Sequence, residues 1–110
     1  MKQAPLAPAA HEVVLWCLRV FRLETELDRQ VQRLAFEVND AVLLALVGRE
    51  RKQQVALADD RSRLLRARLR VAADLGRIED RQLVHANGLL ASIGRQLGGW
   101  SKGLSPTPSR

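Results

Sequence analysis

A cluster of arginines in the second half of the chain carries its clearest chemical signal. The segment RSRLLRARLR, residues 61–70, contains five of them. Guanidinium groups bind phosphate oxygens through two parallel hydrogen bonds, and neutralising phosphates releases counterions. At 100° per residue, four arginines fall within about 60° of one helix face: Arg63, Arg66, Arg70 and Arg77. We interpret this row, the arginine stripe, as a phosphate-contact surface, although a solvated helix face would produce the same row.

The charge balance of the whole chain also indicates a polyanionic partner. The formal net charge is +6, and fifteen of the eighteen basic residues are arginine. Residues 56–110 carry ten basic and five acidic side chains, against eight and seven in residues 1–55. This asymmetry favours binding of a polymer such as nucleic acid. The alternative is an arginine-rich surface that is merely solvated.

Residue types that support catalysis or metal binding are sparse. The two histidines, His11 and His85, have no partners at metal-ligand spacing, and the single cysteine, Cys17, lies in an apolar segment typical of a buried helix. No nucleophile has a base partner, and no glycine-rich loop follows a strand. The sequence therefore predicts a non-enzyme without metal or cofactor.

No apolar run approaches the roughly 20 residues of a membrane span, and the N-terminal residues do not have a signal-peptide pattern. We therefore expect no membrane association and a cytoplasmic location.

The elements that must position the arginines are predicted to be helices. All four prolines lie in the terminal segments, at Pro5, Pro8, Pro106 and Pro108, and Ala, Leu, Arg and Gln are abundant between them. We predict an all-α fold with a flexible leader over residues 1–8, one helical domain over residues 9–102 and a flexible tail over residues 103–110.

Four helices fit the apolar periodicity. They are expected over residues 11–22, from Glu26 to a cap at Gly48, over residues 53–76, and from Asp80 to Gly98. Thr25 and Asp28 resemble a capping pair, and without that cap the first two helices would form a single rod. Short connections predict an antiparallel up-down-up-down four-helix bundle.

The expected core faces follow steps of three and four residues. The first helix is apolar on nearly all sides, which predicts burial on more than one side. In the others the inward residues are expected to be Leu27, Val31, Leu34, Val38, Ala41 or Val42, and Ala45; Leu57, Leu64, Leu65, Val71, Ala72 and Leu75; and Leu83, Ala86, Leu90, Ile93, Leu97 and Trp100.

Arg68 and Arg61 conflict with the predicted core face of the third helix, because the same projection places both on its apolar side. A buried unpaired arginine is costly. Arg68 should therefore pair with Glu37 or Asp40, or face a wet interface between subunits. The second possibility indicates oligomerisation.

The end of the fourth helix combines glycines with a tryptophan. Gly94, Gly98 and Gly99 each cost helix stability, about 1 kcal/mol relative to alanine. We expect either that another backbone approaches closely here or that the helix ends in a left-handed cap, with Trp100 locking that end.

These residues also resemble a known family. The likeness is to the C-terminal half of the accessory variability determinant proteins of diversity-generating retroelements, which are related to four-helix proteins encoded in intervening sequences of bacterial large-subunit ribosomal RNA genes. It covers about residues 55–102, and residues 11–50 only by pattern. The matching residues are Leu65-Arg66, Leu69-Arg70-Val71-Ala72, Asp74-Leu75-Gly76, Ile78, Gln82, the ending Ile93-Gly94-Arg95-Gln96-Leu97-Gly98-Gly99-Trp100, and Lys102.

The resemblance implies a four-helix subunit that assembles into a ring-like homo-oligomer, a pentamer in that family. It also implies binding to RNA or DNA and to a reverse transcriptase, in support of mutagenic copying of a template repeat. Arg66, Arg70, Arg95 and Lys102 match basic positions of the family, and Arg63 and Arg77 extend this set through the arginine stripe.

Two features depart from the family pattern. Residues 22–26, Arg-Leu-Glu-Thr-Glu, stand where the family commonly has a Pro-Lys turn, and Arg68 replaces a usually apolar residue. An alternative function is therefore a structural, homo-oligomeric helical-bundle protein that binds no nucleic acid. Acidic residues of the first two helices, interleaved with the arginines on the assembled surface, would favour this alternative.

Overall fold

Four α-helices make up the described part of this computed structural model, which covers residues 6–104 and the side chains of residues 6–99. They are α1 (Leu6–Val20), α2 (Glu26–Leu46), α3 (Arg51–Asp74) and α4 (Asp80–Leu104). No strand occurs within that range. The predicted all-α class is confirmed.

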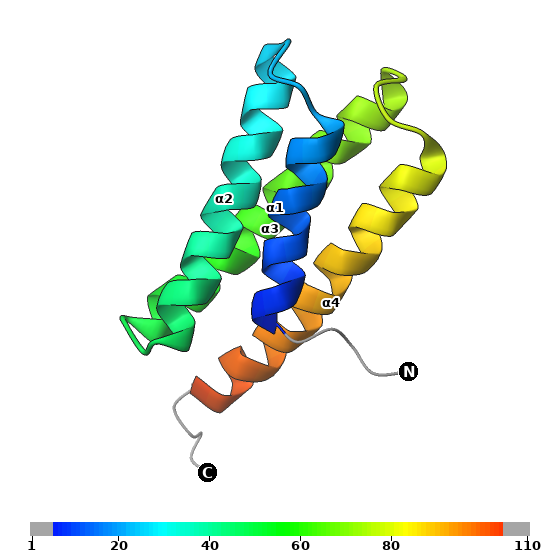
Figure 1. Cartoon of the computed structure of the whole chain (residues 1–110). Coiled ribbons are helices and arrows are strands. Elements are labelled where there is room, and N and C mark those ends of the chain that lie inside the picture. Colours follow the sequence, from blue (N-terminus) through cyan, green and yellow to red (C-terminus); the bar gives the residue numbers. More distant parts are fainter. Residues whose placement is uncertain (1–5, 105–110) are drawn as a thin grey trace.

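Each helix packs against two others. α1 contacts α2 and α4, and α3 contacts the same two helices. The α1–α2 and α3–α4 connections lie at one end of the molecule, and the α2–α3 connection lies at the other (Figure 1). The core therefore lies between all four helices.

The core faces predicted for α2 and α4 are confirmed for the described side chains, with Leu27 and Leu83 partly buried, and α1 is buried against α2 and α4 although Leu18 is 43% exposed. Trp16 and Phe21 bury their rings in an edge-to-face pair with centroids 6.1 Å apart. Trp100, predicted to lock the end of α4, lies outside the described side chains. The largest side chains with under 2% exposure are apolar, apart from one aspartate: Phe21, Leu65, Leu69, Leu90, Ile93, Leu97, Val31, Val38, Val42, Asp28 and Cys17.

The predicted core face of α3 is wrong at three of its six residues. Leu64 and Val71 are more than 40% exposed and Leu75 is 67% exposed, whereas Leu65 and Ala72 are buried and Leu57 is partly buried, as predicted. The complete buried face is Val55, Ala58, Ser62, Leu65, Leu69 and Ala72. This face also has steps of three and four, but small residues occupy half of it. The large apolar residues Leu64, Val71 and Leu75 form a second arc on α3, and their size made that arc look like the core face.

The break between α1 and α2 is made by a capping box, so the single-rod alternative is wrong. Thr25 Oγ1 accepts a hydrogen bond from the backbone N–H of Asp28 at 3.2 Å, and Asp28 Oδ2 accepts one from the N–H of Thr25 at 3.1 Å. The N–H of Glu24 donates to the same carboxylate oxygen at 2.9 Å. One aspartate thus satisfies two orphan donors at the start of α2.

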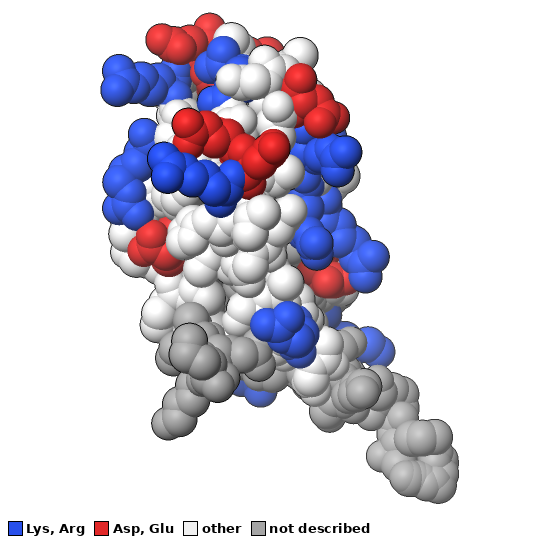
Figure 2. Space-filling view, turned by 90° about the vertical axis from the view of Figure 1, so that its right-hand side faces the viewer, with Lys and Arg blue, Asp and Glu red and all other residues white. Residues whose placement is uncertain are grey.

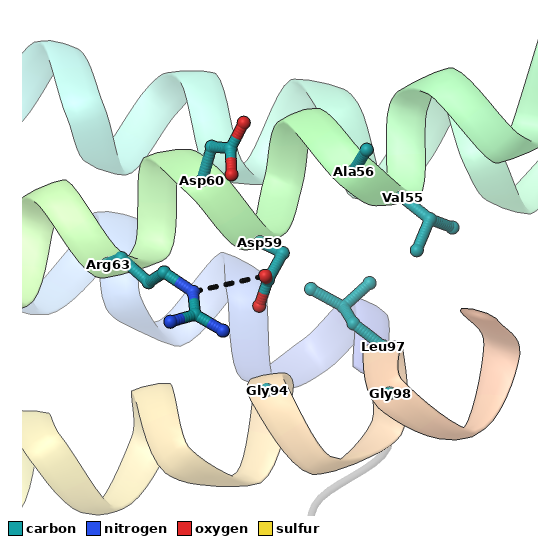
Figure 3. Close-up of a pocket in the computed structure, with 8 residues that line it drawn as sticks. All are labelled: Val55, Ala56, Asp59, Asp60, Arg63, Gly94, Leu97 and Gly98. Carbon is teal, nitrogen blue, oxygen red and sulfur yellow. Dashed lines mark hydrogen bonds and ion pairs between the residues drawn. The ribbon is translucent and has the colours of Figure 1, made fainter. Parts of the chain in front are cut away.

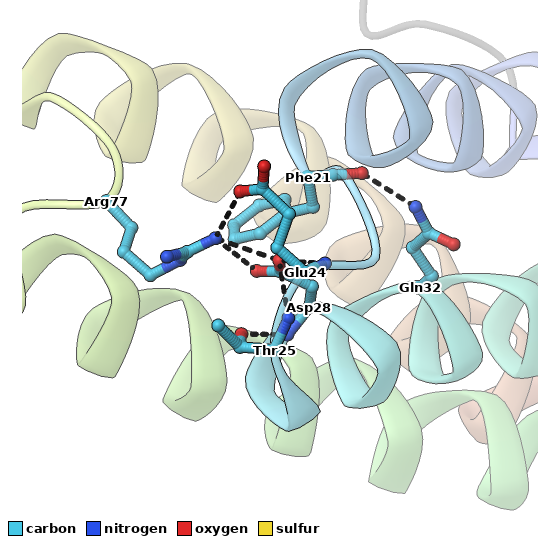
Figure 4. A network of polar contacts seen from close by, with 6 residues as sticks. All are labelled: Phe21, Glu24, Thr25, Asp28, Gln32 and Arg77. Carbon is cyan, nitrogen blue, oxygen red and sulfur yellow. Dashed lines mark hydrogen bonds and ion pairs between the residues drawn. The ribbon is translucent and has the colours of Figure 1, made fainter.

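The carboxylate of Asp28 is fully buried and is paired across the bundle. Arg77, in the α3–α4 connection, donates from Nη2 to Oδ1 and Oδ2 at 2.9 and 2.8 Å (Figure 4). Burial alone would raise the pKa of Asp28. The backbone hydrogen bonds from Glu24 and Thr25 and the Arg77 guanidinium outweigh it, so this pKa lies below its usual value of 3.8.

Glycines in the left-handed region follow the ends of α2 and α3, as predicted for Gly48 and Gly76. Their φ angles are +82° and +77°. α3 ends at Asp74, two residues before the predicted boundary, because Leu75 is the C-cap and Gly76 turns the chain. α1 begins at Leu6 rather than His11 and so includes Pro8, which is tolerated in a first helical turn.

The glycines of α4 neither cap the helix nor meet another backbone. The helix continues past Gly98 and Gly99 to Leu104. A Cβ atom built at Gly94, Gly98 or Gly99 would meet no atom within 4 Å. The expected close approach of another backbone and the expected left-handed cap are therefore both wrong within the single chain.

Replacing Gly94 by alanine should raise the free energy of unfolding. The site is helical and spacious, so the helix propensity of alanine adds about 0.5–1 kcal/mol. Gly48→Ala is the matched control and should lower the same quantity by about 1 kcal/mol, because Gly48 is in the left-handed region. Urea unfolding of both variants measures the two changes. Loss of stability in Gly94→Ala would show that this face is covered in solution.

Asp28→Asn should lower the free energy of unfolding by about 2–3 kcal/mol at pH 7, because Arg77 loses its closest partner and keeps only the longer contact of 3.7 Å to Glu24. The pKa of Asp28 is depressed in the folded state. Its contribution is therefore fully present above the unfolded-state value of 3.8 and is lost as the pH falls through the folded-state value. Denaturant titrations at several pH values should show the difference between wild type and variant shrinking below about pH 4. A pH-independent difference would contradict this account.

Candidate nucleic-acid interface

Three members of the arginine stripe lie on the edge of α3 that faces α4. The side chains of Arg63 and Arg70 are 78% and 72% exposed. Each is paired one turn away: Arg63 Nε with Asp59 Oδ2 at 3.1 Å, and Arg70 Nε with Asp74 Oδ1 at 3.2 Å. Exposed pairs of this kind contribute about 0.3–0.5 kcal/mol, so a phosphate can displace the carboxylate at little cost.

Arg66 is the member of the stripe with no competing contact. It is exposed, and no ion pair or hydrogen bond to its guanidinium occurs among the described residues. It lines a hollow between α3 and α4 of about 380 Å³, which also involves Arg63 and Arg95.

The hollow continues toward the other end of the two helices. A neighbouring one of about 330 Å³ shares Asp59, Arg63 and Gly94 with it, and Figure 3 shows α3 and α4 facing each other across this second part. We call the two parts together the α3–α4 groove. Asp59 and Asp60 make its second part acidic, so the surplus of positive charge lies in the first part, at Arg66 and Arg95.

Ser62 adds an unsatisfied polar atom to the first part of the groove. The residue is 4% exposed and lines the hollow, and its Oγ has no hydrogen-bond partner within the described chain. Buried hydroxyl groups are normally hydrogen-bonded. The Oγ itself is fully buried, so an anion beside Arg66 reaches it only if the neighbouring side chains move.

Arg77 does not belong to the arginine stripe. α3 ends at Asp74, so the helical projection that placed Arg77 on this face fails beyond that residue. Arg77 instead crosses to α2, contacts Asp28 and lies 3.7 Å from Glu24. Its guanidinium is occupied by contacts that stabilise the fold.

The two remaining predicted residues come from α4. Arg95 is exposed and lines the first part of the α3–α4 groove, so it lies across from Arg66. The prediction for Lys102 falls outside the described side chains.

Arg61 and Arg68 lie on the opposite edge of α3, which faces α2. Arg61 Nε donates to Glu37 Oε1 at 3.0 Å, and Arg68 Nε donates to Gln30 Oε1 at 2.8 Å. The expectation that Arg68 pairs with Glu37 or Asp40 is therefore wrong. Both arginines were misplaced because the predicted core face of α3 was rotated toward them. The seven-residue spacing shared by Arg61–Arg68 and Gln30–Glu37 could have indicated the true face.

The surface mixes both signs of charge. Figure 2 shows basic side chains along both edges and in the upper part of the face on which α4 lies, with acidic side chains among them and an uncharged area between the edges. This mixture limits attraction over long distances and favours local contacts at defined arginines.

Residues 6–99 present no group of three or more His, Cys, Asp or Glu side chains that could hold a metal ion. Burial raises the pKa of the Cys17 thiol to about 12, so it stays protonated and unreactive at neutral pH. Among the described helices, none is both long and apolar enough to cross a membrane.

Comparison with known proteins identifies no relative of this chain. No family model, curated protein or solved structure matches it.

Proposed function

We propose that the protein is a non-catalytic accessory factor of a diversity-generating retroelement, which binds template RNA or its cDNA and the element's reverse transcriptase in the cytoplasm. The resemblance of residues 55–102 to the accessory variability determinant proteins points to the retroelement and the polymerase. Nucleic-acid binding has independent support in the side chains of α3.

The observation that supports nucleic-acid binding is the composition of the first part of the α3–α4 groove. It combines the unpaired guanidinium of Arg66, the weakly paired Arg63 and the basic Arg95. Such a set suits a phosphate oxygen, which accepts several hydrogen bonds and carries negative charge. Arg70 continues the row one turn further along α3.

Contacts of this kind neutralise phosphates and do not read bases. No aromatic side chain lines the described parts of the groove, so base stacking does not contribute there. Binding should therefore be weakly sequence-selective and strongly salt-dependent.

The proposed assembly is an antiparallel up-down-up-down bundle that forms a ring of five subunits. The alternation of the connections between the two ends of the molecule supports the antiparallel order.

A second candidate function is that of a structural, homo-oligomeric bundle without nucleic-acid binding. The observation that favours it is the outer face of α2, where Phe36 and Leu43 are 44% and 46% exposed and Val47 is 71% exposed. Seven- and four-residue spacings place them in one row. Large exposed apolar rows commonly mark protein interfaces.

The triple variant Arg63→Gln, Arg66→Gln, Arg70→Gln should bind single-stranded RNA or DNA more weakly. Removing three phosphate contacts should reduce the slope of log K against log [salt] by about 2. Fluorescence anisotropy with a labelled mixed-sequence strand at several salt concentrations measures the change.

The matched control is the triple variant Arg19→Gln, Arg22→Gln, Arg81→Gln, which removes the same charge from exposed positions outside the groove. Its affinity should stay within about threefold of wild type, since it loses only long-range attraction. Equal losses in both triple variants would assign binding to overall charge, and no loss in the first would remove the arginine stripe as the contact surface.

Sedimentation velocity measures the mass of the particle in solution and so tests the assembly. The proposal predicts a particle of five times 12.3 kDa. Phe36→Asp with Leu43→Asp should dissociate it, because two carboxylates would be desolvated in the interface. The control Val84→Asp changes a 70% exposed residue of α4 and should leave the mass unchanged. A wild-type monomer would contradict both the ring and the structural alternative.

A further inference from the structure

A second basic hollow lies between α2 and α3, on the opposite edge of α3 from the arginine stripe. It has a volume of about 460 Å³. We call it the α2–α3 groove. Residues at positions 30, 33, 34 and 37 line it from α2, and residues at positions 61, 64 and 68 line it from α3: Gln30, Arg33, Leu34, Glu37, Arg61, Leu64 and Arg68.

Two hydrogen-bonded crossings close the ends of this groove. Arg68 Nε donates to Gln30 Oε1 at 2.8 Å at one end, and Arg61 Nε donates to Glu37 Oε1 at 3.0 Å at the other. The crossings are seven residues apart on each helix, or about 10 Å. Both crossings join α2 to α3 beside the hollow.

The charge inside the groove is not balanced. Glu37 neutralises Arg61. Arg33 has no ion pair or hydrogen bond among the described residues, and the contact of Arg68 within them is to the neutral amide of Gln30. The lining therefore carries a surplus of two positive charges. Both guanidiniums retain free N–H groups, because Arg68 uses only its Nε.

The wall between the two crossings is apolar. Leu64 is 41% exposed and Leu34 is 9% exposed, and both line the groove. An apolar wall beside two guanidiniums suits a ligand with a carbon-rich body and one compact anionic group. The volume falls within the range of about 300–1,000 Å³ that is usual for small-molecule sites.

We infer that the α2–α3 groove binds a phosphate monoester, with the phosphate held by Arg33 and Arg68 and the organic part against Leu64 and Leu34. A monoester carries about −1.5 to −2 charge at pH 7, which matches the surplus of two. An internal phosphodiester carries a single charge and would leave one guanidinium unmatched. The ligand is either a free nucleotide-like molecule or the phosphorylated end of a strand.

The inference goes beyond the proposed function. A free monoester can occupy this groove whether or not a strand binds in the α3–α4 groove, and the two sites share no lining residue. They can therefore be tested separately.

The test uses the full chain labelled with ¹⁵N and the probes adenosine 5′-monophosphate, inorganic phosphate and adenosine. The Nε–Hε signals of Arg33 and Arg68 should shift and saturate with adenosine 5′-monophosphate. Inorganic phosphate should shift them with weaker affinity, because it lacks the part that contacts the leucines, and adenosine should not shift them. Equal movement of all arginine signals would indicate general ion screening and would overturn the inference.

Variants separate binding at this site from the general effect of charge. Arg33→Gln should weaken binding of adenosine 5′-monophosphate by about tenfold or more, because charge-assisted hydrogen bonds are lost. Arg22→Gln, the matched control at an exposed arginine outside both grooves, should leave this affinity within twofold. Unchanged binding in Arg33→Gln would overturn the inference. Circular dichroism of the variant shows whether a loss of binding comes from unfolding.

Short oligonucleotides with a 5′-phosphate or a 5′-hydroxyl distinguish the two sources of the ligand. If strand ends are the ligand, the 5′-phosphate should raise affinity, and Arg33→Gln should abolish the increase without altering the salt slope. If both oligonucleotides bind equally while adenosine 5′-monophosphate binds at Arg33, the ligand is a free monoester. If no phosphate probe binds, the α2–α3 groove is not a phosphate monoester site. That result would leave the proposed strand binding at Arg66 unaffected.

Discussion

The rest of the structure depends on the pair between the buried carboxylate of Asp28 and Arg77, whose side chain is 31% exposed. Asp28 caps α2 and closes the α1–α2 connection through its oxygens, and Arg77 brings the α3–α4 connection onto the same carboxylate. The start of α2, the α1–α2 connection and the α3–α4 connection thus meet at one fully buried side chain (Figure 4). Because Arg77 follows α3 by only three residues, this contact also constrains how α3 rotates about its axis. That rotation decides which arginines face each groove.

The core face of α3 is narrow, and this has a functional consequence. Ala58, Ser62 and Ala72 occupy half of it, so α2 and α4 can approach α3 closely while both of its edges stay in water. Arginines on both edges therefore remain available to ligands, with Arg66 toward α4 and Arg68 toward α2. A wider apolar face would have buried one row or forced it into ion pairs.

The sequence predicted most strongly those elements in which large apolar residues form one face. The faces of α2 and α4, the Thr25 cap and the turns at Gly48 and Gly76 all depend on local chemistry that a single chain reveals. The rotation of α3 could not be predicted in the same way, since its large apolar residues form a competing arc at Leu64, Val71 and Leu75. Packing against α2 and α4 selects the arc with smaller side chains.

The candidate site was predicted to the extent that it depends on α3 alone. Arg63, Arg66 and Arg70 share a helix face whichever arc is buried. Arg77 was misassigned because the helical projection was continued past the end of α3 at Asp74. Its contact with Asp28, 49 residues away in sequence, and the α2–α3 groove were missed because both need contacts between separate elements. Long-range contacts of this kind leave no local pattern.

A double-mutant cycle between Asp28 and Arg77 tests the central claim most directly. The free energies of unfolding of Asp28→Asn, Arg77→Gln and the double variant give the coupling energy between the two side chains. A pair with a buried, doubly hydrogen-bonded carboxylate predicts a coupling of about 2 kcal/mol or more at pH 7. Effects that add within about 0.5 kcal/mol would mean that the two residues act independently, and would contradict the account.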